Sequence, residues 1–341
     1  MTSQILNLKK LARTPVAKAV VATCSAIPSA RPLFAAMRMT PSTFGNRVVR
    51  VPLRPHRESL RMMGAGSVHL VFQLFWRGID YYEPFTRLTV ETLSSSSSSL
   101  IDVGANVGFF SLVAAKLNPQ LKVFAFEPNP QMFQYLAKHK LLNGLTNLKT
   151  ESMAVSDHDG EAELFLSQSD MSASLVSDFQ ESNSLHASVP VKTVTLDSYV
   201  QQFGISGSIL LKVDAEGHEK AVLEGAEVTI ARFKPDVVIE VLKDFDPFLL
   251  EQFHDLGYRF YKITHQGLIE TKSVTLTQIG EFVFFNYLFT TRPAAELERI
   301  SQLIRERAQH INLYLTSKFI GKQAIGEMLE PLPPVLEHEN A

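Results

Sequence analysis

The sequence predicts an α/β fold with a seven-stranded, mostly parallel sheet that is flanked by helices and preceded by an N-terminal extension. From residue 100 onward, short apolar runs alternate with helical patterns, which is typical of parallel sheets. A small-residue turn after Asp102 joins the first of these runs to a helical pattern. The 341 residues are 45% hydrophobic and 20% charged, a composition that suits a globular protein with a sizeable core.

Residues 1–65 are expected to form a basic, flexible arm that prolines interrupt repeatedly. Residues 1–61 contain three lysines and eight arginines against one acid, Glu58, so they carry about +10 and the rest of the chain about −12. Such an arm would suit the anionic surface of a membrane or another anionic partner. The simpler interpretation is a solvated tail, and the sequence leaves both open.

The segment 19–27 follows several lysines and resembles a weak secretory signal, but it is short and ends at Pro28. No apolar stretch reaches the ~20 residues that span a bilayer. The single cysteine, Cys24, excludes an intrachain disulfide and a cysteine zinc site. We therefore expect a cytoplasmic protein whose arm could contact the inner face of the membrane.

Residues 66–99 are expected to form a helical or extended cap before the main domain. Apolar residues alternate from Val68 to Trp76, and Tyr81-Tyr82-Glu83-Pro84 leads into a helix that reaches Leu93. The serine run 94–99 predicts a flexible joint.

The main domain is expected over residues 100–290, and a C-terminal helix with a disordered tail over 291–341. We predict strands near 100–103, 122–126, 148–155, 208–213, 236–241, 258–263 and 281–287. We predict helices near 107–117, 130–142, 217–231, 246–256 and 294–316. An insertion at 157–200 should contain a hairpin around a polar loop, and the last strand could enter the sheet antiparallel.

Acidic residues end three of the predicted strands: Asp102, Glu127 and Asp214. In open α/β sheets, ligands bind outside the carboxyl ends of the strands, so these carboxylates should converge on one site. A dinucleotide loop reads G-x-G-x-x-G, but Asn106 and Phe109 stand where its second and third glycines belong. The motif D-x-G-x-N-x-G over residues 102–108 instead favours S-adenosylmethionine as the cofactor.

Each part of that cofactor has expected partners. Asp102 should organise the methionine end through the loop, and Glu127 should accept hydrogen bonds from the ribose hydroxyls. An apolar slot for the adenine is expected after the third strand. The expected cofactor-binding residues are Asp102, Gly104, Asn106, Gly108, Glu127, Met153, Ala154 and Asp214.

The loop after the fourth strand offers candidate catalytic groups in Asp214, Glu216 and His218. His218 is the loop's only imidazole and is the natural base for an acceptor hydroxyl. Acids in such a loop also cap helices, so a purely structural role stays open. Together with Glu240 these groups could bind a divalent metal, but their spacing is not diagnostic and no metal site is assigned.

Several segments, in order and spacing, make the chain resemble the FkbM-type methyltransferase family over roughly residues 78–265. The matching segments are Asp102-Val-Gly-Ala-Asn-Val-Gly108, Phe126-Glu127-Pro128-Asn129-Pro130, Ala154-Val155-Ser156-Asp157, Val194-Thr195-Leu196-Asp197, Lys212-Val-Asp-Ala-Glu-Gly-His-Glu219 and Val222-Leu223-Glu224-Gly225-Ala226. The resemblance implies a class I methyltransferase (Rossmann-like) fold, S-adenosylmethionine and O-methylation of sugar or polyketide hydroxyls. Ala215 departs from the bulkier apolar residue that is frequent in the family.

From these observations we expect an S-adenosylmethionine-dependent methyltransferase that acts on a hydroxyl of a sugar, glycolipid or secondary metabolite. Its partner would be a small-molecule or glycan acceptor, and no nucleic acid is expected. Two alternatives stay open. One is an NAD-type oxidoreductase, and the other is a non-catalytic binding module that keeps the nucleotide fold.

Overall fold

The computed structural model describes residues 48–53, 55–63, 69–167, 173–174, 185–241, 246–275, 277–279 and 282–311. The arm up to residue 47, the signal-like segment within it, most of the polar insertion loop and the tail after residue 311 lie outside the described residues.

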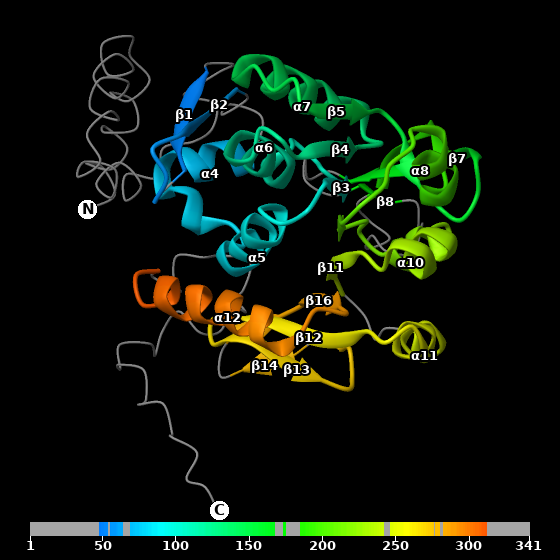
Figure 1. Ribbon diagram of the computed structural model, residues 1–341. Helices are drawn as coiled ribbons and strands as arrows, with labels where there is room; N and C mark the ends of the chain where they lie inside the picture. The colour runs from blue at the N-terminus through cyan, green and yellow to red at the C-terminus, as the bar shows by residue number, and fades with distance from the viewer. Residues whose placement is uncertain are drawn as a thin grey trace, which may run out of the picture.

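A mostly parallel sheet of eight strands forms the centre of the protein (Figure 1). Its order across the sheet is β13 (Gly267–Thr271), β12 (Arg259–Thr264), β16 (Asn286–Thr290), β11 (Asp236–Glu240), β10 (Ile209–Val213), β3 (Ser99–Val103), β4 (Lys122–Phe126) and β5 (Leu148–Glu151). The central strands β3, β10 and β11 are buried along their whole length, which explains their nearly continuous apolar sequences.

One late strand, β16, runs antiparallel between β11 and β12. This insertion distinguishes the sheet from an all-parallel dinucleotide fold, and with the strand order it confirms the expected class I methyltransferase fold. The expected count of seven strands was too low, because β12 turns tightly at residues 265–266 into the additional antiparallel strand β13. The strand predicted at 281–287 is in fact two strands, β15 (Phe282–Phe284) and β16.

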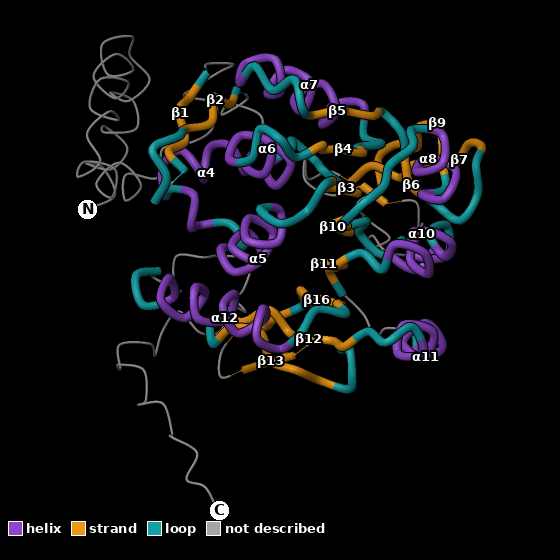
Figure 2. Tube along the Cα trace, viewed as in Figure 1, coloured by secondary structure: helices purple, strands orange, loops and turns teal. Residues whose placement is uncertain are grey.

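Helices cover both faces of the sheet, and each face has its own apolar core (Figures 1 and 2). One face packs against α4 (His69–Arg77), α5 (Pro84–Ser94), α6 (Phe109–Leu117), α7 (Pro130–Asn143) and α12 (Ala294–Ala308). The other face packs against α8 (Leu196–Gln202), α9 (Glu219–Glu224), α10 (Glu227–Phe233) and α11 (Pro247–Asp255). Among the described residues, no helix combines the length and apolar character needed to cross a membrane.

Helix α7 shows how local sequence sets an element's limits. The Asn129 side chain accepts hydrogen bonds from the N–H groups of Gln131 and Met132, and Pro130 occupies the first turn. Gly144 ends the helix in a left-handed conformation, with φ of 65°. These signals explain why the predicted helix at 130–142 agrees closely with the observed one.

The N-terminal part corrects one expectation and decides between two alternatives in another. Residues 48–62 were expected within the irregular arm, but β1 (Val49–Pro52) and β2 (Ser59–Met62) form an antiparallel hairpin with a buried apolar face. Residues 69–77, which were expected to be helical or extended, form helix α4. Its buried residues Leu70, Val71, Leu74 and Phe75 recur at helical spacing, so the alternation of apolar residues was misleading.

The serine run 94–99 is an ordered turn, not the expected flexible joint. The hydroxyl groups of Ser95, Ser96 and Ser97 donate to carbonyls of the last turn of α5. The N–H of Ser98 then donates to the carbonyl of Ser208, and the chain enters β3 directly. Serine composition alone did not reveal that these hydroxyls cap a helix.

The insertion contains the expected hairpin. Strands β7 (Gly160–Ser167) and β9 (Leu185–Val194) pair antiparallel and join β6 (Ala154–Val155) and β8 (Ala173–Ser174) in a small sheet. A second small sheet pairs β14 (Thr277–Ile279) with β15, and a short 3-10 helix, η3 (Ile79–Tyr81), precedes α5.

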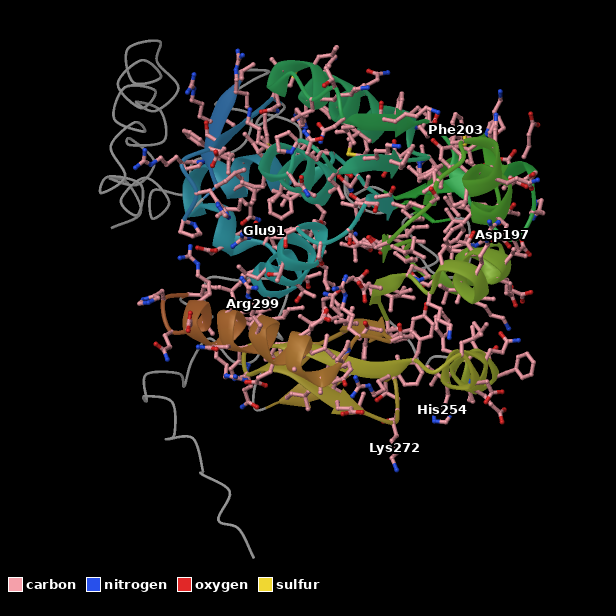
Figure 3. All side chains as sticks on the ribbon, viewed as in Figure 1. Glu91, Asp197, Phe203, His254, Lys272 and Arg299 are labelled. Atoms are coloured by element: carbon pink, nitrogen blue, oxygen red, sulfur yellow. The ribbon has the colours of Figure 1, made fainter. Side chains whose placement is uncertain are left out.

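Residues 217–231 were expected as one helix but form α9 and α10, which are separated at Gly225 and Ala226. A Cβ on Gly225 would lie 2.0 Å from the carbonyl oxygen of Ser156. Asp197, labelled in Figure 3, accepts hydrogen bonds from the N–H groups of Val228 and Thr229 at 2.9 and 2.7 Å and so caps α10. Close packing at Gly225 and this cap explain the break.

Candidate functional site

The turn between β3 and α6 brings the backbone of residues 104–108 to the carboxyl edge of the sheet. Gly104, Asn106 and Gly108 have φ angles of 74°, 52° and 90°, in the left-handed region. A Cβ on Gly104 would lie 1.8 Å from the carbonyl oxygen of Asp214. Glycine is therefore required where the loops that follow β3 and β10 meet.

Glu127 lies directly after β4, and 6% of its surface is exposed. Its Oε2 accepts a hydrogen bond from the N–H of Asn106 at 2.6 Å, and its Oε1 accepts one from the N–H of Asn129 at 2.8 Å. Burial raises the pKa of Glu127 to about 7, although these two bonds oppose the shift. Each carboxylate oxygen has further acceptor capacity, which a ribose diol could use.

Asp102 is fully buried at the end of β3. Its Oδ2 accepts hydrogen bonds from the N–H of Ser111 at 3.2 Å and from the Ser111 hydroxyl at 2.6 Å. Its Oδ1 lies 3.7 Å from Nζ of Lys212. Burial raises the pKa of Asp102, while Lys212 and Ser111 act in the opposite direction. Asp102 thus holds the first turn of α6 against the strand.

A buried lysine, Lys212, is surrounded by carboxylates at the carboxyl edge of β10. Its Nζ is 3.3 Å from Oδ2 of Asp214, and 3% of the residue is exposed. Burial alone would lower its pKa, but Asp214, Asp102, Glu83 and Glu240 together raise it. Carboxylate oxygens of Glu83, Asp214 and Glu240 lie within 4.8 Å of one another. We call these five side chains the charged cluster.

Sequence reasoning missed two members of the charged cluster, Glu83 and Lys212. Glu83 precedes β3 by many residues, but as the N-cap of α5 it is buried and adopts a φ of 40°. Asn286 Nδ2 on β16 donates to its Oε2 at 3.4 Å. Lys212 could have been found, because it is a lone charged residue inside an apolar strand. A lysine is rarely buried without a charged partner.

The loop after β10 is arranged by a residue that we did not assign to the site, Glu219. Its Oε1 accepts hydrogen bonds from the N–H groups of Ala215 and Gly217, each at 3.0 Å. Glu216 lies between them with a φ of 50° and is half-buried. Of the four described non-glycine residues with positive φ, three (Glu83, Asn106 and Glu216) lie at this site, where such strain is commonly stored.

His218 contacts the loop after β6. Its Nε2 lies 3.0 Å from Oγ of Ser156, and that hydroxyl donates to Oδ1 of Asp157 at 3.0 Å. The hydroxyl proton is therefore engaged by Asp157, so Nε2 of His218 is the donor and its Nδ1 has the free lone pair. Burial lowers the pKa of His218, which keeps the ring neutral.

The expected adenine slot follows β5. Ala154 is buried and begins β6, whereas Met153 is half-buried and packs against the apolar core that α8 to α11 cover. These residues are thus near core side chains, and their contact with an adenine remains a prediction.

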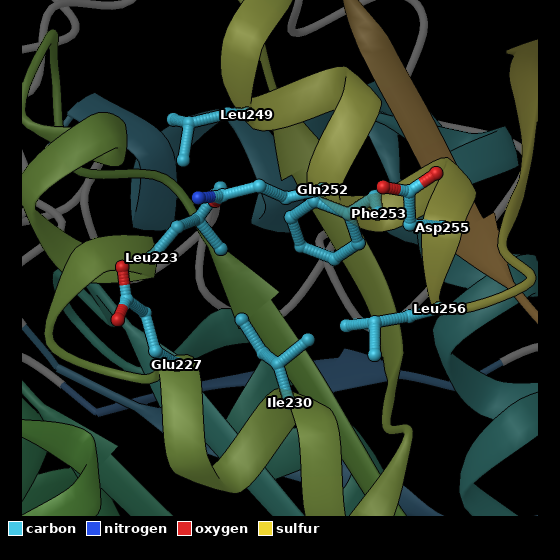
Figure 4. Close-up of a pocket in the computed structure, with 8 residues that line it drawn as sticks. All are labelled: Leu223, Glu227, Ile230, Leu249, Gln252, Phe253, Asp255 and Leu256. Carbon is cyan, nitrogen blue, oxygen red and sulfur yellow. The ribbon is translucent and has the colours of Figure 1, made fainter.

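A separate pocket of about 330 Å³ lies between α9, α10 and α11 (Figure 4). None of the predicted site residues lines it. Its lining residues are Leu223, Glu227, Ile230, Leu249, Gln252, Phe253, Asp255 and Leu256.

The match to known proteins covers most of this site, and Glu83 lies before the matched region. Residues 102–260 match the family model described as the methyltransferase FkbM domain. Methyltransferase sdnD of Sordaria araneosa is 28% identical over 174 residues, which cover 42% of this chain and 66% of the relative. Hexuronic acid methyltransferase AglP of Haloferax volcanii is 27% identical over 43% of this chain and 57% of the relative. The 2-O-methyltransferase NoeI of Sinorhizobium fredii is 23% identical over 43% and 64%.

The sheet order and the match to the family model define a class I methyltransferase-type domain. The similarity of this chain to the FkbM methyltransferase family lies in this domain, residues 102–260. The matched region spans about two thirds or less of the relatives' own lengths.

The residues present fit the cofactor. A glycine-containing turn, the buried carboxylate of Glu127 and the charged cluster meet at the carboxyl edge of β3, β4 and β10. S-adenosylmethionine carries a sulfonium and an ammonium, and the cluster holds four carboxylates against one ammonium. Buried carboxylates in excess favour a cationic ligand.

Proposed function

We propose that this protein is an S-adenosylmethionine-dependent O-methyltransferase that acts on a hydroxyl of a sugar, glycolipid or secondary metabolite. The main support for this proposal is that Glu127, the loop 104–108 and the charged cluster meet at one edge of the sheet. The cofactor supplies an electrophilic methyl group, so catalysis depends largely on the positioning of the acceptor.

The cofactor-binding assignments extend this proposal. Glu127 would accept from the ribose hydroxyls, and Gly104, Asn106 and Gly108 would allow close approach of the backbone. Asp102 would act indirectly, because it holds the start of α6 through Ser111. Asp214 would face the methionine end together with Lys212. Met153 and Ala154 would border the adenine.

The acceptor's proton requires a base. His218 is the proposed base, because its neutral ring has a lone pair at Nδ1 when Nε2 donates to Ser156. Glu216 and Asp214 lie in the same loop and would orient the acceptor. The names of AglP and NoeI support a sugar-type acceptor and transfer to oxygen, respectively.

Transfer of an isotopically labelled methyl group from S-adenosylmethionine tests the activity. The protein is incubated with a panel of uronic acid glycosides, neutral glycosides and polyketide alcohols, and products are examined by mass spectrometry. The proposal expects one labelled methyl on oxygen in at least one product. The absence of any product with a labelled methyl group on oxygen would contradict O-methylation of these acceptor classes.

The basic arm is proposed to bind anionic membrane surfaces, and residues 48 onward belong to the hairpin rather than to the arm. Residues 1–47 contain seven basic residues and no acidic residue. Binding to vesicles that contain phosphatidylserine should fall as salt rises past ~0.15 M, where the Debye length is ~8 Å. Deletion of residues 1–47 should abolish vesicle binding and leave cofactor binding intact. No binding at low salt would support a solvated tail instead.

A further inference from the structure

We propose that His139 is a positioning residue of the cofactor loop, which it holds through the carbonyl oxygen of Val107 and links to the N-terminal hairpin. The functional consequence rests on the proposed function, because the loop 104–108 is taken to bind S-adenosylmethionine. Nothing in the family motifs includes His139, which lies in the middle of α7.

A few hydrogen bonds hold the backbone of the cofactor loop. The N–H groups of Gly104 and Ala105 donate to the carbonyl of Phe126 at 3.1 and 2.9 Å. The N–H of Val107 donates to Oδ1 of Asn106 at 2.7 Å. The buried carbonyl of Val107 faces Nδ1 of His139 at 2.9 Å. A side chain of α7 thus satisfies a buried polar group of the loop.

The second ring nitrogen of His139 decides which nitrogen carries the proton. The N–H of Met63, just after β2, donates to Nε2 of His139 at 3.0 Å, and the carbonyl oxygen of Met63 also lies 3.0 Å from Nε2. A proton on Nδ1 satisfies both the carbonyl of Val107 and the N–H of Met63, whereas a proton on Nε2 would satisfy only the carbonyl of Met63. We therefore assign the single ring proton of the neutral imidazole to Nδ1, where it is donated to Val107. The side chain is fully buried, and burial lowers its pKa, which favours the neutral ring. The hairpin thus fixes the tautomer that holds the loop.

Two more residues on the same face of α7 contact the loop or the hairpin. Leu136 lies one turn before His139, and a Cβ on Gly108 would be 2.4 Å from its Cδ1. Asn143 lies one turn after His139, donates to the carbonyl of Arg61 at 2.8 Å and accepts from the Arg61 N–H at 2.8 Å. The stripe Leu136, His139 and Asn143 therefore connects the loop to the hairpin, and His139 alone of the three hydrogen-bonds both.

Two conservative variants separate the two ends of this link. The amide of His139→Asn reaches the position of Nδ1, so it keeps a donor for the carbonyl of Val107 and loses the hydrogen bond with Met63. The amide of His139→Gln reaches the position of Nε2, so it keeps a hydrogen-bond partner for Met63 and loses the hydrogen bond to the carbonyl of Val107. Asn143→Leu is the matched control, because it removes hairpin contacts and leaves the loop's hydrogen bond intact.

Hydrogen exchange of the ligand-free protein and calorimetry with S-adenosylhomocysteine measure the effects. In His139→Gln the amides of residues 104–111 should exchange faster, and the affinity should fall about 10-fold, as expected for an unpaired buried carbonyl. His139→Asn and Asn143→Leu should keep the affinity within about twofold and loosen residues 59–63 instead. Equal effects of Asn and Gln on the loop and on affinity would overturn the proposal.

The two readouts also separate this inference from the proposed function. If the wild-type protein does not bind S-adenosylhomocysteine, the proposed function fails, whereas hydrogen exchange still tests whether His139 holds the loop. If the wild type binds and His139→Gln binds equally well, only the role of His139 is wrong.

Discussion

Replacement of Glu127 by alanine should weaken the binding of S-adenosylhomocysteine at least ~10-fold, because each charge-assisted hydrogen bond to a ribose hydroxyl contributes about 1.5–3 kcal/mol. The same carboxylate also accepts the N–H groups of Asn106 and Asn129, so its loss should loosen both loops. Isothermal calorimetry with the purified variant measures the change directly.

Asp236→Asn is the matched control for a lost buried carboxylate. Asp236 is buried at the start of β11, where it accepts from Arg292 Nε at 2.7 Å and from the hydroxyl of Thr290. The Asp236→Asn substitution should lower the thermal stability. It should leave the affinity for S-adenosylhomocysteine unchanged, because Asp236 lies at the opposite end of β11 from Glu240. Unchanged affinity in Glu127→Ala would exclude a ribose role for Glu127.

The raised pKa of Glu127 adds a pH dependence with a definite sign. Between its ordinary value of 4.5 and about 7 the folded protein holds the proton, so this carboxyl contributes stability that is complete below pH 4.5 and lost as pH rises through about 7. The ribose needs the ionised acceptor, so affinity should rise about 10-fold between pH 6 and 8. Glu127→Gln should remove that rise, and a wild-type affinity independent of pH would contradict the assignment.

Replacement of His218 by alanine should lower turnover on the true acceptor by about 10²- to 10⁴-fold, as is typical for the loss of a general base. Affinity for S-adenosylhomocysteine should change little, because the loss falls on proton transfer. The acidic limb of the pH–rate profile should lie below pH 6.5, since burial lowers the pKa of His218, and it should disappear in the variant.

His158→Ala is the control, because His158 is an exposed imidazole that contacts Asp157 at 2.6 Å, next to the partner of His218. It should keep near-full activity. If His218→Ala also keeps it and chelators abolish turnover, a divalent metal held by Glu83, Asp214 and Glu240 becomes the better mechanism. If neither intervention matters, the acceptor's base lies elsewhere.

Much of the fold followed from patterns within single segments. The strands that end at Asp102, Glu127 and Asp214 are buried on both faces, so continuous apolar runs predicted them well. The sequence did not decide between a helix and an extended segment for α4, because its apolar residues satisfy both periods over nine positions. The additional strand β13 was missed because it is short and most of its residues are only half-buried at the edge of the sheet.

The site was partly predictable for a similar reason. Strand ends and glycines indicate the sheet edge, so the loop 104–108 and Glu127 could be assigned from sequence. Glu83 could not, because its place depends on how α5 packs beside β10 and β11. The partner of His218 could not be predicted from sequence either, since Ser156 is 62 residues away in the chain.

Calorimetric titration of the full chain with S-adenosylmethionine, S-adenosylhomocysteine and NAD tests the central claim most directly. The turn has Asn106 and Phe109 where a dinucleotide loop requires glycines, so a pyrophosphate would lose its closest backbone approach. We predict saturable binding of both adenosyl compounds and no binding of NAD. Tighter binding of NAD than of S-adenosylhomocysteine would favour an oxidoreductase, and the absence of all three would favour a non-catalytic module; either result would contradict the account.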